Sequence, residues 1–247
     1  MKQLGLVGYP LGHSRSPKLF RQFFARDHAE GWDYRLFPME DISGLRGWLM
    51  DNPDVIGLNV TIPHKETVIP HLDELDDAAR KTGAVNCVKI SRNPTLQLKG
   101  YNTDVPGFAR MLDAHLQGRK ITALVLGNGG ASKAVQYVLR MREIPFKTVS
   151  RYKGNADLVY EEVDAEIVQQ HHLIINTTPL GMQGVYEGMA PNLPYWYLSA
   201  EHICLDLVYN PEFTPFMELS ALQDARVENG MSMLRAQAEA AWKIFRE

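Results

Sequence analysis

The sequence predicts an α/β protein of two domains, in which the strands of a sheet alternate with helices along the chain. Three observations support this prediction. Short apolar runs alternate with amphipathic segments, a strand pair flanks a proline-containing turn, and a glycine-rich turn joins a later strand to a helix. The 247 residues, of which 45% are hydrophobic and 22% charged, are enough for two modest domains.

The first domain is expected to contain a mixed sheet. Apolar runs predict strands at 4–7, 34–38 and 55–62, with a helix at 42–50. Strands at 84–91 and 95–99 flank Arg92-Asn93-Pro94, which indicates an antiparallel hairpin within an otherwise α/β pattern. Ser16-Pro17 is typical of an N-cap followed by a proline at the first helical position.

The second domain is expected to begin near Asp104, where Thr103 or Asp104 can cap a helix that runs from Pro106 to about Leu116. A strand at 121–126 leads through the glycine-rich turn into a helix that ends near Met141. Later strands are expected at 146–149, 173–177 and 203–208. This βαβ rhythm predicts a Rossmann-like, doubly wound domain.

The composition argues against several classes of protein. A net charge of -3 and a pI near 6.2 argue against a nucleic-acid binder. No run approaches the roughly 20 apolar residues of a membrane span, and the N-terminal apolar stretch is too short for a signal peptide. Cys87 and Cys204 lie far apart, so reduced thiols in a cytoplasmic protein are the simplest account. The eight histidines show no ligand spacing, and we expect no metal site.

Lys65 is the first candidate for chemistry. Pro63 ends the apolar strand, since proline cannot donate to a central ladder, and Lys65 then lies past the carboxyl end of that strand. Open parallel sheets place their ligand crevices at that edge. An ammonium there can pass a proton to or from a substrate hydroxyl, although most lysines beside a turn are solvated surface charges.

The glycine-rich turn is the second candidate. Gly127, Gly129 and Gly130 stand where a strand becomes a helix, so the backbone can approach a pyrophosphate and the helix amides face the anion. Ser132 occupies the third glycine position of the usual pattern, and a tight strand-to-helix connection is the alternative interpretation. The context on both sides favours nucleotide binding.

The segment after the next strand indicates which dinucleotide is bound. An NAD site needs an acidic residue there for the ribose 2′-hydroxyl, but the chain has Ser150-Arg151-Tyr152-Lys153. Arg151 and Lys153 suit the 2′-phosphate of NADP, with Ser150 as a further donor. A charge-assisted hydrogen bond contributes about 1.5–3 kcal/mol, a preference of roughly 10- to 150-fold. Exposed basic residues are common, yet NADP is the favoured cofactor.

Seven motifs, spread over essentially the whole chain, resemble those of the shikimate dehydrogenase family and follow in the same order. The first four are GYPLGHSRSP at 8–17, GLNVTIPHK at 57–65, TGAVN at 82–86 and GYNTD at 100–104. The last three are the turn from Gly127, NTTPLGM at 176–182 and DLVYNP at 206–211. Any one of them could arise by chance, whereas seven in sequence are specific.

The resemblance implies reversible NADPH-dependent reduction of 3-dehydroshikimate to shikimate, in the pathway to aromatic amino acids. It implies a catalytic, substrate-binding domain at 1–104, completed by the C-terminal helix 230–247, and a dinucleotide-binding domain at 105–229. The catalytic pair falls on Lys65 and Asp104. Lys65 would stabilise charge on the substrate oxygen and deliver the proton, while Asp104 holds the lysine. Burial disfavours an ammonium and a carboxylate favours it, so Lys65 stays open as neutral base or charged acid.

The resemblance also implies the binding residues. Ser14 and Ser16 would hold the substrate carboxylate, where a helix start adds partial positive charge. The remaining substrate contacts would come from Asn59, Thr61, Lys65, Asn86, Asp104, Tyr209 and Gln237. The cofactor contacts would come from Gly127, Asn128, Gly129, Gly130, Ala131, Ser150, Arg151, Lys153, Thr177, Met182, Gly230 and Met231. Simpler roles stay open for several of these, as helix caps, buried asparagines, a packing tyrosine and core methionines.

The chain departs from the family pattern in three places. Phe20-Arg21 stands in place of a histidine–asparagine pair, while Cys87 and Tyr152 each replace a threonine. Two other functions stay open. A quinate/shikimate dehydrogenase that uses NAD would need an acidic group where Arg151 stands, and a non-catalytic shikimate-binding regulator would not need both members of the catalytic pair. We expect a monomer or a homodimer.

Overall fold

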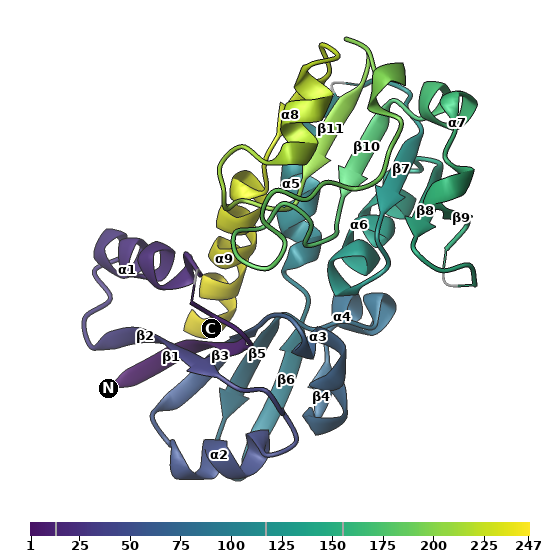
Figure 1. Ribbon diagram of the computed structural model, residues 1–247. Coiled ribbons are helices and arrows are strands. Elements are labelled where there is room, and N and C mark those ends of the chain that lie inside the picture. The colour runs from purple at the N-terminus through teal and green to yellow at the C-terminus, as the bar shows by residue number, and fades with distance from the viewer. Residues whose placement is uncertain (13, 117, 155) are drawn as a thin grey trace. The chain divides into compact units, whose positions relative to one another are not determined.

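The computed structural model describes residues 1–12, 14–116, 118–154 and 156–247, so that His13 of the first motif lies outside the described residues. The chain forms two compact units (Figure 1). The first unit comprises Met1–Gly107 and Arg235–Glu247, and the second comprises Phe108–Leu234. Each unit contains one sheet that has six strands among the described residues.

The sheet of the first unit is mixed. Its strand order is β2-β1-β3-β5-β6-β4, with bounds β1 Lys2–Gly8, β2 Trp32–Pro38, β3 Val55–Val60, β4 Glu74–Leu75, β5 Cys87–Ser91 and β6 Gln97–Tyr101. The pairs β1/β2, β1/β3 and β4/β6 are parallel, whereas β5 is antiparallel to both β3 and β6. The predicted hairpin and the mixed sheet are therefore confirmed.

Two of the predicted strands of this first unit are shorter than expected, and the reason matters for the site. β3 ends at Val60 rather than at 62, because the amide of His64 donates to the carbonyl of Thr61 and opens a turn, with N···O at 2.8 Å. β5 starts at Cys87 rather than at 84, because the amide of Val85 donates to the carbonyl of Lys65 at 2.7 Å. The segment before β5 is thus tied to the lysine turn instead of the ladder.

Short helices flank this sheet: α1 Ser16–Arg26, α2 Leu45–Asp51, α3 His64–Thr67 and α4 Asp77–Thr82, with a 3₁₀ turn at Ile69–His71. Ser16 was predicted as the N-cap of α1, and this prediction was wrong by one residue. Arg15 occupies that position without a side-chain cap, and Ser16 is the first helical residue. Its amide donates to the Ser14 hydroxyl at 3.2 Å, which satisfies one of the amides left free at a helix start.

The C-terminal helix α9, Met231–Arg246, ends in the first unit. Ala238 and Ala241 are fully buried, and Phe245 lies directly on β3, where a Cβ added to Gly57 would be 2.4 Å from its ring. Trp242 is also fully buried and meets Phe20 of α1 edge-on. The apolar side of α9 therefore faces the core of this unit.

The sheet of the second unit is entirely parallel among the described strands. Its order is β12-β11-β10-β7-β8-β9, with bounds β7 Ala123–Leu126, β8 Phe146–Ser150, β9 Leu158–Val159, β10 Leu173–Asn176, β11 Ile203–Asp206 and β12 Arg226–Glu228. The chain winds outward from β7 to β9 and then returns to β10, so the order reverses between β7 and β10. This is the strand order of a Rossmann-like, doubly wound domain, as predicted.

Helices precede or follow several of these strands along the chain. They are α5 Asp104–Leu116, α6 Gly130–Met141, α7 Ala165–Gln170 and α8 Pro215–Ala221, with 3₁₀ turns at Tyr160–Glu162 and Tyr195–Tyr197. Every residue of β7, β10 and β11 is buried, as expected for strands with both faces covered. Within the part of the chain that the structure describes, the helices are too short or too polar to cross a membrane.

Candidate active site

Lys65 is held by its backbone and by its neighbour in α3. The buried imidazole of His64 bonds through Nε2 to the carbonyl of Met39 at 2.7 Å. The carbonyl of Lys65 accepts the amide of Val85, as described above. The start of the lysine side chain is therefore fixed by contacts from two other segments of the first unit.

The side chain of Lys65 meets Asp104, the first residue of α5. Nζ donates to Oδ2 at 2.6 Å, with the lysine side chain 18% exposed and the aspartate side chain 7% exposed. The two residues are 39 positions apart in the sequence and are brought together by the fold, since Asp104 follows β6 and Lys65 follows β3. The carboxylate of Asp104 thus has a partner other than the helix, and the pair is mostly shielded from water, where ionic contacts are stronger.

Asn86 lies at the centre of the hydrogen bonds around this pair and is 3% exposed. Its Nδ2 donates to Oδ1 of Asp104 at 2.9 Å and to Oε1 of Gln237 at 3.4 Å. Its Oδ1 accepts the amide of Thr103 at 2.7 Å. We call Lys65, Asn86, Thr103, Asp104 and Gln237 the lysine cluster.

Two residues that the sequence interpretation missed help to hold this region. The Thr103 hydroxyl, expected only as a possible helix cap, lies 3.1 Å from Oδ1 of Asn86 and 3.2 Å from Oε1 of Gln237. The Tyr34 hydroxyl donates to Oδ1 of Asn59 at 3.0 Å, and Nδ2 of Asn59 donates to the carbonyl of Asn86 at 3.3 Å. Thr103 could have been found inside the GYNTD motif, whereas no local signal marks Tyr34.

The remaining substrate candidates are less connected. Ser16 is buried at the start of α1, while Ser14 and Thr61 are half-buried. The backbone amide of Thr61 donates to Val7 at 2.9 Å, which keeps the residue in line with β1. Among the described residues, the hydrogen bonds of these three do not reach the lysine cluster. Tyr209 is half-buried in the second unit.

The glycine turn lies at the switch point of the second sheet, directly after β7. Gly127 has φ of +102°, and a Cβ there would be 2.8 Å from Oγ1 of Thr177, the first residue after β10. A Cβ on Gly129 would meet no atom within 4 Å, so this side of the turn is open. The hydroxyl of Ser132 donates to the carbonyl of Gly127 at 2.7 Å, which gives the serine at the third glycine position a structural role.

Arg151 and Lys153 follow β8, whose Val149 accepts the amide of Gly127 at 2.8 Å, so the cations and the turn share one edge of the sheet. Arg151 is exposed, and Lys153 pairs with Glu162. The buried hydroxyl of Ser150 donates to the carbonyl of Tyr152 at 2.7 Å. Two cations and an open backbone turn are a fit for a phosphate-bearing dinucleotide.

The other cofactor candidates lie on two loops of the same unit. Met182 is 40% exposed, and its amide donates to the carbonyl of Pro179 at 3.0 Å. Gly230 has no room for a side chain, because a Cβ would be 2.2 Å from the carbonyl oxygen of Leu207. The amide of Met231 donates to the Asn229 side chain at 3.0 Å, at the start of α9.

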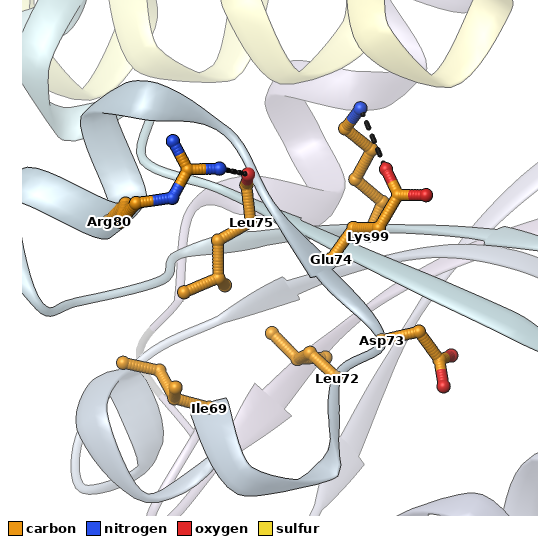
Figure 2. Close-up of a pocket in the computed structure, with 7 residues that line it drawn as sticks. All are labelled: Ile69, Leu72, Asp73, Glu74, Leu75, Arg80 and Lys99. Carbon is orange, nitrogen blue, oxygen red and sulfur yellow. Dashed lines mark hydrogen bonds and ion pairs between the residues drawn. The ribbon is translucent and has the colours of Figure 1, made fainter.

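A cavity of about 600 Å³ in the first unit is a different place from the lysine cluster (Figure 2). It lies beside the short edge strand β4, with Ile69, Leu72 and Leu75 at its base. Its charged groups are used within the protein, since Lys99 pairs with Glu74 at 3.1 Å. We assign it no chemistry.

Metal and thiol chemistry find no support in the described residues. No three His, Cys, Asp or Glu side chains in that part of the chain lie close enough to hold a metal ion. Burial raises the pKa of the Cys87 thiol, and raises the pKa of Cys204 to about 12. Both thiols are free, buried and protonated at neutral pH, so neither is set up as a nucleophile.

The family model for the shikimate dehydrogenase substrate binding domain matches residues 6–88. A relative from Carboxydothermus hydrogenoformans, named shikimate dehydrogenase (NADP(+)), is 34% identical, with 98% of this chain and 90% of the relative covered.

Two solved structures have the same fold. Shikimate 5-dehydrogenase from Thermus thermophilus, in complex with NADP(H) and shikimate, is 30% identical, with a TM-score of 0.86 over 99% of this chain and 93% of that one. Quinate dehydrogenase from Corynebacterium glutamicum, in complex with NAD, is 27% identical, with a TM-score of 0.84 over 99% of this chain and 93% of that one. The motifs, both sheets and the full-length match to the Carboxydothermus relative all agree, and the chain belongs to the shikimate dehydrogenase family.

Proposed function

We propose that this protein catalyses the reversible NADPH-dependent reduction of 3-dehydroshikimate to shikimate, a step in aromatic amino-acid biosynthesis. The observation that carries the proposal is the contact between Lys65 and Asp104, whose Nζ and Oδ2 are 2.6 Å apart in a mostly buried setting. The names of the relatives at about one-third identity support the substrate and the cofactor.

Lys65 supplies the proton in this reaction. Negative charge develops on the carbonyl oxygen of the substrate as it is reduced, and an ammonium beside that oxygen stabilises the charge and delivers the proton. Asp104 keeps the Nζ of Lys65 in place and accepts a hydrogen bond from a neighbouring hydroxyl of the substrate. NADPH, when bound, supplies the hydride. In the reverse direction Lys65 takes the proton from the hydroxyl of shikimate.

The polar residues of the first unit provide the rest of the substrate site in this proposal. Ser14 and Ser16 donate hydroxyl hydrogens to the carboxylate at the start of α1. The ring hydroxyls bond to Thr61, Asn86 and Gln237, because each hydroxyl needs a partner once water is excluded. Asn59 bonds to Tyr34 and to the Asn86 carbonyl, and acts by shaping the pocket as well as by contact.

The second unit provides the cofactor site in this proposal. The backbone at 127–131 would face the pyrophosphate, and Arg151 and Lys153 would face the 2′-phosphate, with Ser150 beside them. Thr177, Met182, Gly230 and Met231 would line the nicotinamide half. We assign substrate binding and catalysis to 1–104 with 230–247, and dinucleotide binding to 105–229 together with Gly230 and Met231.

We also propose a cytoplasmic location, because both cysteines are buried free thiols that suit a reducing compartment. A monomer or a homodimer is proposed for the assembly, and light scattering on the purified protein measures which one forms.

Absorbance of the reduced nicotinamide at increasing shikimate concentration tests the function directly. We expect shikimate oxidation with NADP⁺ to have a higher kcat/KM than with NAD⁺, and quinate to be a poor substrate. A higher kcat/KM with NAD⁺ would favour the quinate/shikimate dehydrogenase that uses NAD. Shikimate binding without any absorbance change would favour the non-catalytic regulator instead.

A further inference from the structure

Asn176 and Asp206 form a buried pair at the carboxyl edge of the second sheet. They are the last residues of β10 and β11, they stand opposite each other in the parallel register, and both are fully buried. β10 adjoins β7, so the pair lies next to the switch point where the glycine turn begins. The resemblance placed both residues inside motifs but gave neither of them a role.

Asn176 holds the loop that follows β10. Its Oδ1 accepts the amide of Thr178 at 3.0 Å and the hydroxyl of Thr178 at 2.7 Å. Its Nδ2 donates to Oδ1 of Asp206 at 3.0 Å. One side chain thus fixes the start of the loop at 177–182 and links it to the neighbouring strand.

Asp206 holds the loop that follows β11. Its Oδ1 also accepts the amide of Val208 at 2.9 Å, and its Oδ2 accepts the hydroxyl of Thr214 at 2.6 Å. Thr214 is fully buried and caps α8. A Cβ added to Gly181 would be 3.2 Å from Cβ of Thr214, so the first loop also packs against this threonine.

A buried carboxylate is energetically unfavourable, and it is not required simply to end two strands. Burial opposes its ionisation and raises the pKa of Asp206 to about 6. A well-packed neutral side chain would avoid that desolvation, and buried ionic groups are weak contributors to stability. What the carboxylate does provide is three acceptor bonds that place two separate loops relative to each other.

We propose that Asn176 and Asp206 are positioning residues that set the loops at 177–182 and 207–211 for the nicotinamide half of the cofactor and for the substrate. The two loops contain Thr177, Met182 and Tyr209, while the adenosine half of the cofactor is served by the glycine turn and the segment after β8. The inference rests on the proposed function for the identity of these ligands. It predicts that damage to the pair affects one half of the cofactor and spares the other.

Asp206→Asn is the variant of choice. An asparagine keeps the shape, but its amide group must face one of the three donors that now meet a carboxylate. Losing a charge-assisted bond of this kind changes an equilibrium constant by roughly 10- to 150-fold. We expect kcat/KM with NADP⁺ and shikimate to fall by at least about tenfold, while the Kd of adenosine 2′,5′-bisphosphate, which lacks nicotinamide, changes by less than about twofold.

The matched control is Ser220→Ala in α8. Ser220 is equally buried and donates to the carbonyl of Phe216 at 2.7 Å, away from both loops. We expect it to leave kcat/KM and the Kd of adenosine 2′,5′-bisphosphate unchanged. Thr214→Val removes a single donor from Asp206 with the same shape, and it takes the place of Asp206→Asn should that variant not fold.

Hydrogen exchange in the protein without ligands separates this inference from the proposed function. We expect the amides of Thr178 and Val208 to exchange at least about tenfold faster in the variant, while the amide of Thr148, bonded to Asp157 in the same sheet, does not change. Should the wild type fail to oxidise shikimate, the proposed function fails, and the exchange rates still decide whether the pair holds the loops. Equal losses for both ligands, or faster loop exchange with unchanged kcat/KM, would overturn the inference.

Discussion

The lysine cluster of the first unit and the glycine turn of the second unit are built in different ways. The cluster consists of side chains that bond to one another and are mostly buried. As whole residues, Asn86 and Asp104 are 3% and 5% exposed. The turn consists of backbone, with an open space at Gly129 and exposed cations after the next strand. The difference indicates that the first unit is organised before it meets a ligand, whereas the second presents groups that a ligand must complete. Substitutions should therefore affect turnover in one unit and affinity in the other.

Removing the ammonium of Lys65 should produce the largest effect. We expect Lys65→Ala to lower kcat by roughly 10²- to 10⁴-fold, the range for general acid–base catalysis, with a much smaller change in the KM for shikimate. Steady-state kinetics at saturating NADP⁺ measures both. Lys99→Ala in the same unit removes a half-buried lysine that pairs with Glu74, and it should leave kcat unchanged. Near-normal turnover in Lys65→Ala would remove the lysine from the mechanism.

The buried carboxylate of Asp206 is the exception in the second unit, and the pH dependence of stability tests it. Burial raises its pKa from 3.8 to about 6, outweighing bonds from Thr214, Val208 and Asn176 that lower it. Because the pKa is higher in the folded state, protonation of Asp206 stabilises that state. This contribution is complete at pH values below 3.8, the pKa in the unfolded state, and it is lost as the pH rises through about 6. The difference corresponds to about 3 kcal/mol. Of the neighbouring ionisable groups, Tyr195 and Cys204 have raised pKa values and stay neutral in this range.

Asp206→Asn removes this titration. The free energy of unfolding of the variant, relative to the wild type, should therefore rise between pH 4 and pH 7. Urea unfolding at several pH values measures the two stabilities, and all other titrating groups cancel in the difference. A difference that does not vary with pH would show that Asp206 is ionised across the whole range.

The preference for NADP over NAD tests the role of the exposed cations in the second unit. We expect Arg151→Ala to weaken NADP⁺ by roughly 10- to 150-fold, because a charge-assisted bond to the 2′-phosphate is lost, while NAD⁺ is hardly affected. Titration calorimetry measures the Kd of NADP⁺ and of NAD⁺ for the variant and for the wild type. Arg119→Ala, an exposed arginine of the same unit, is the control. Equal losses for both nucleotides would mean that Arg151 does not contact the phosphate.

The sequence predicted those helices and strands in which apolar residues follow a clear pattern and in which the ends are marked by particular residues. The strand before Gly127 and the hairpin around Pro94 are examples, because glycine and proline mark where the chain must turn. The strands β4, β9 and β12 were not predicted, since two or three residues are too short to show a period. Their place is set by pairing with a neighbouring strand instead.

The candidate site could be predicted only where one residue carries the signal. Lys65 follows an apolar strand and a proline, and its contact with Asp104 followed from the family motifs. The bond from Tyr34 to Asn59 has no such signal, because it depends on β1 lying between β2 and β3. Asn176 and Asp206 likewise meet because β10 and β11 pair in one particular register. Sheet order and register are properties of the whole fold, and a single sequence shows them poorly.

Substitution of Gly127 and of Gly129, two of the glycines of the turn, should give the smallest effects, and the two variants should differ from each other. Gly127→Ala forces a side chain to a φ of +102° and to within 2.8 Å of the Thr177 hydroxyl, so we expect it to lower the free energy of unfolding by about 1–3 kcal/mol. Gly129→Ala has an ordinary φ of -80° and no atom within 4 Å of the added Cβ, so its stability should match the wild type. The open space at Gly129 is then available only to a ligand. If a pyrophosphate occupies it, Gly129→Ala must weaken NADP⁺ and NAD⁺ alike without a change in Tm. Unaltered binding of both nucleotides would place the pyrophosphate away from this turn.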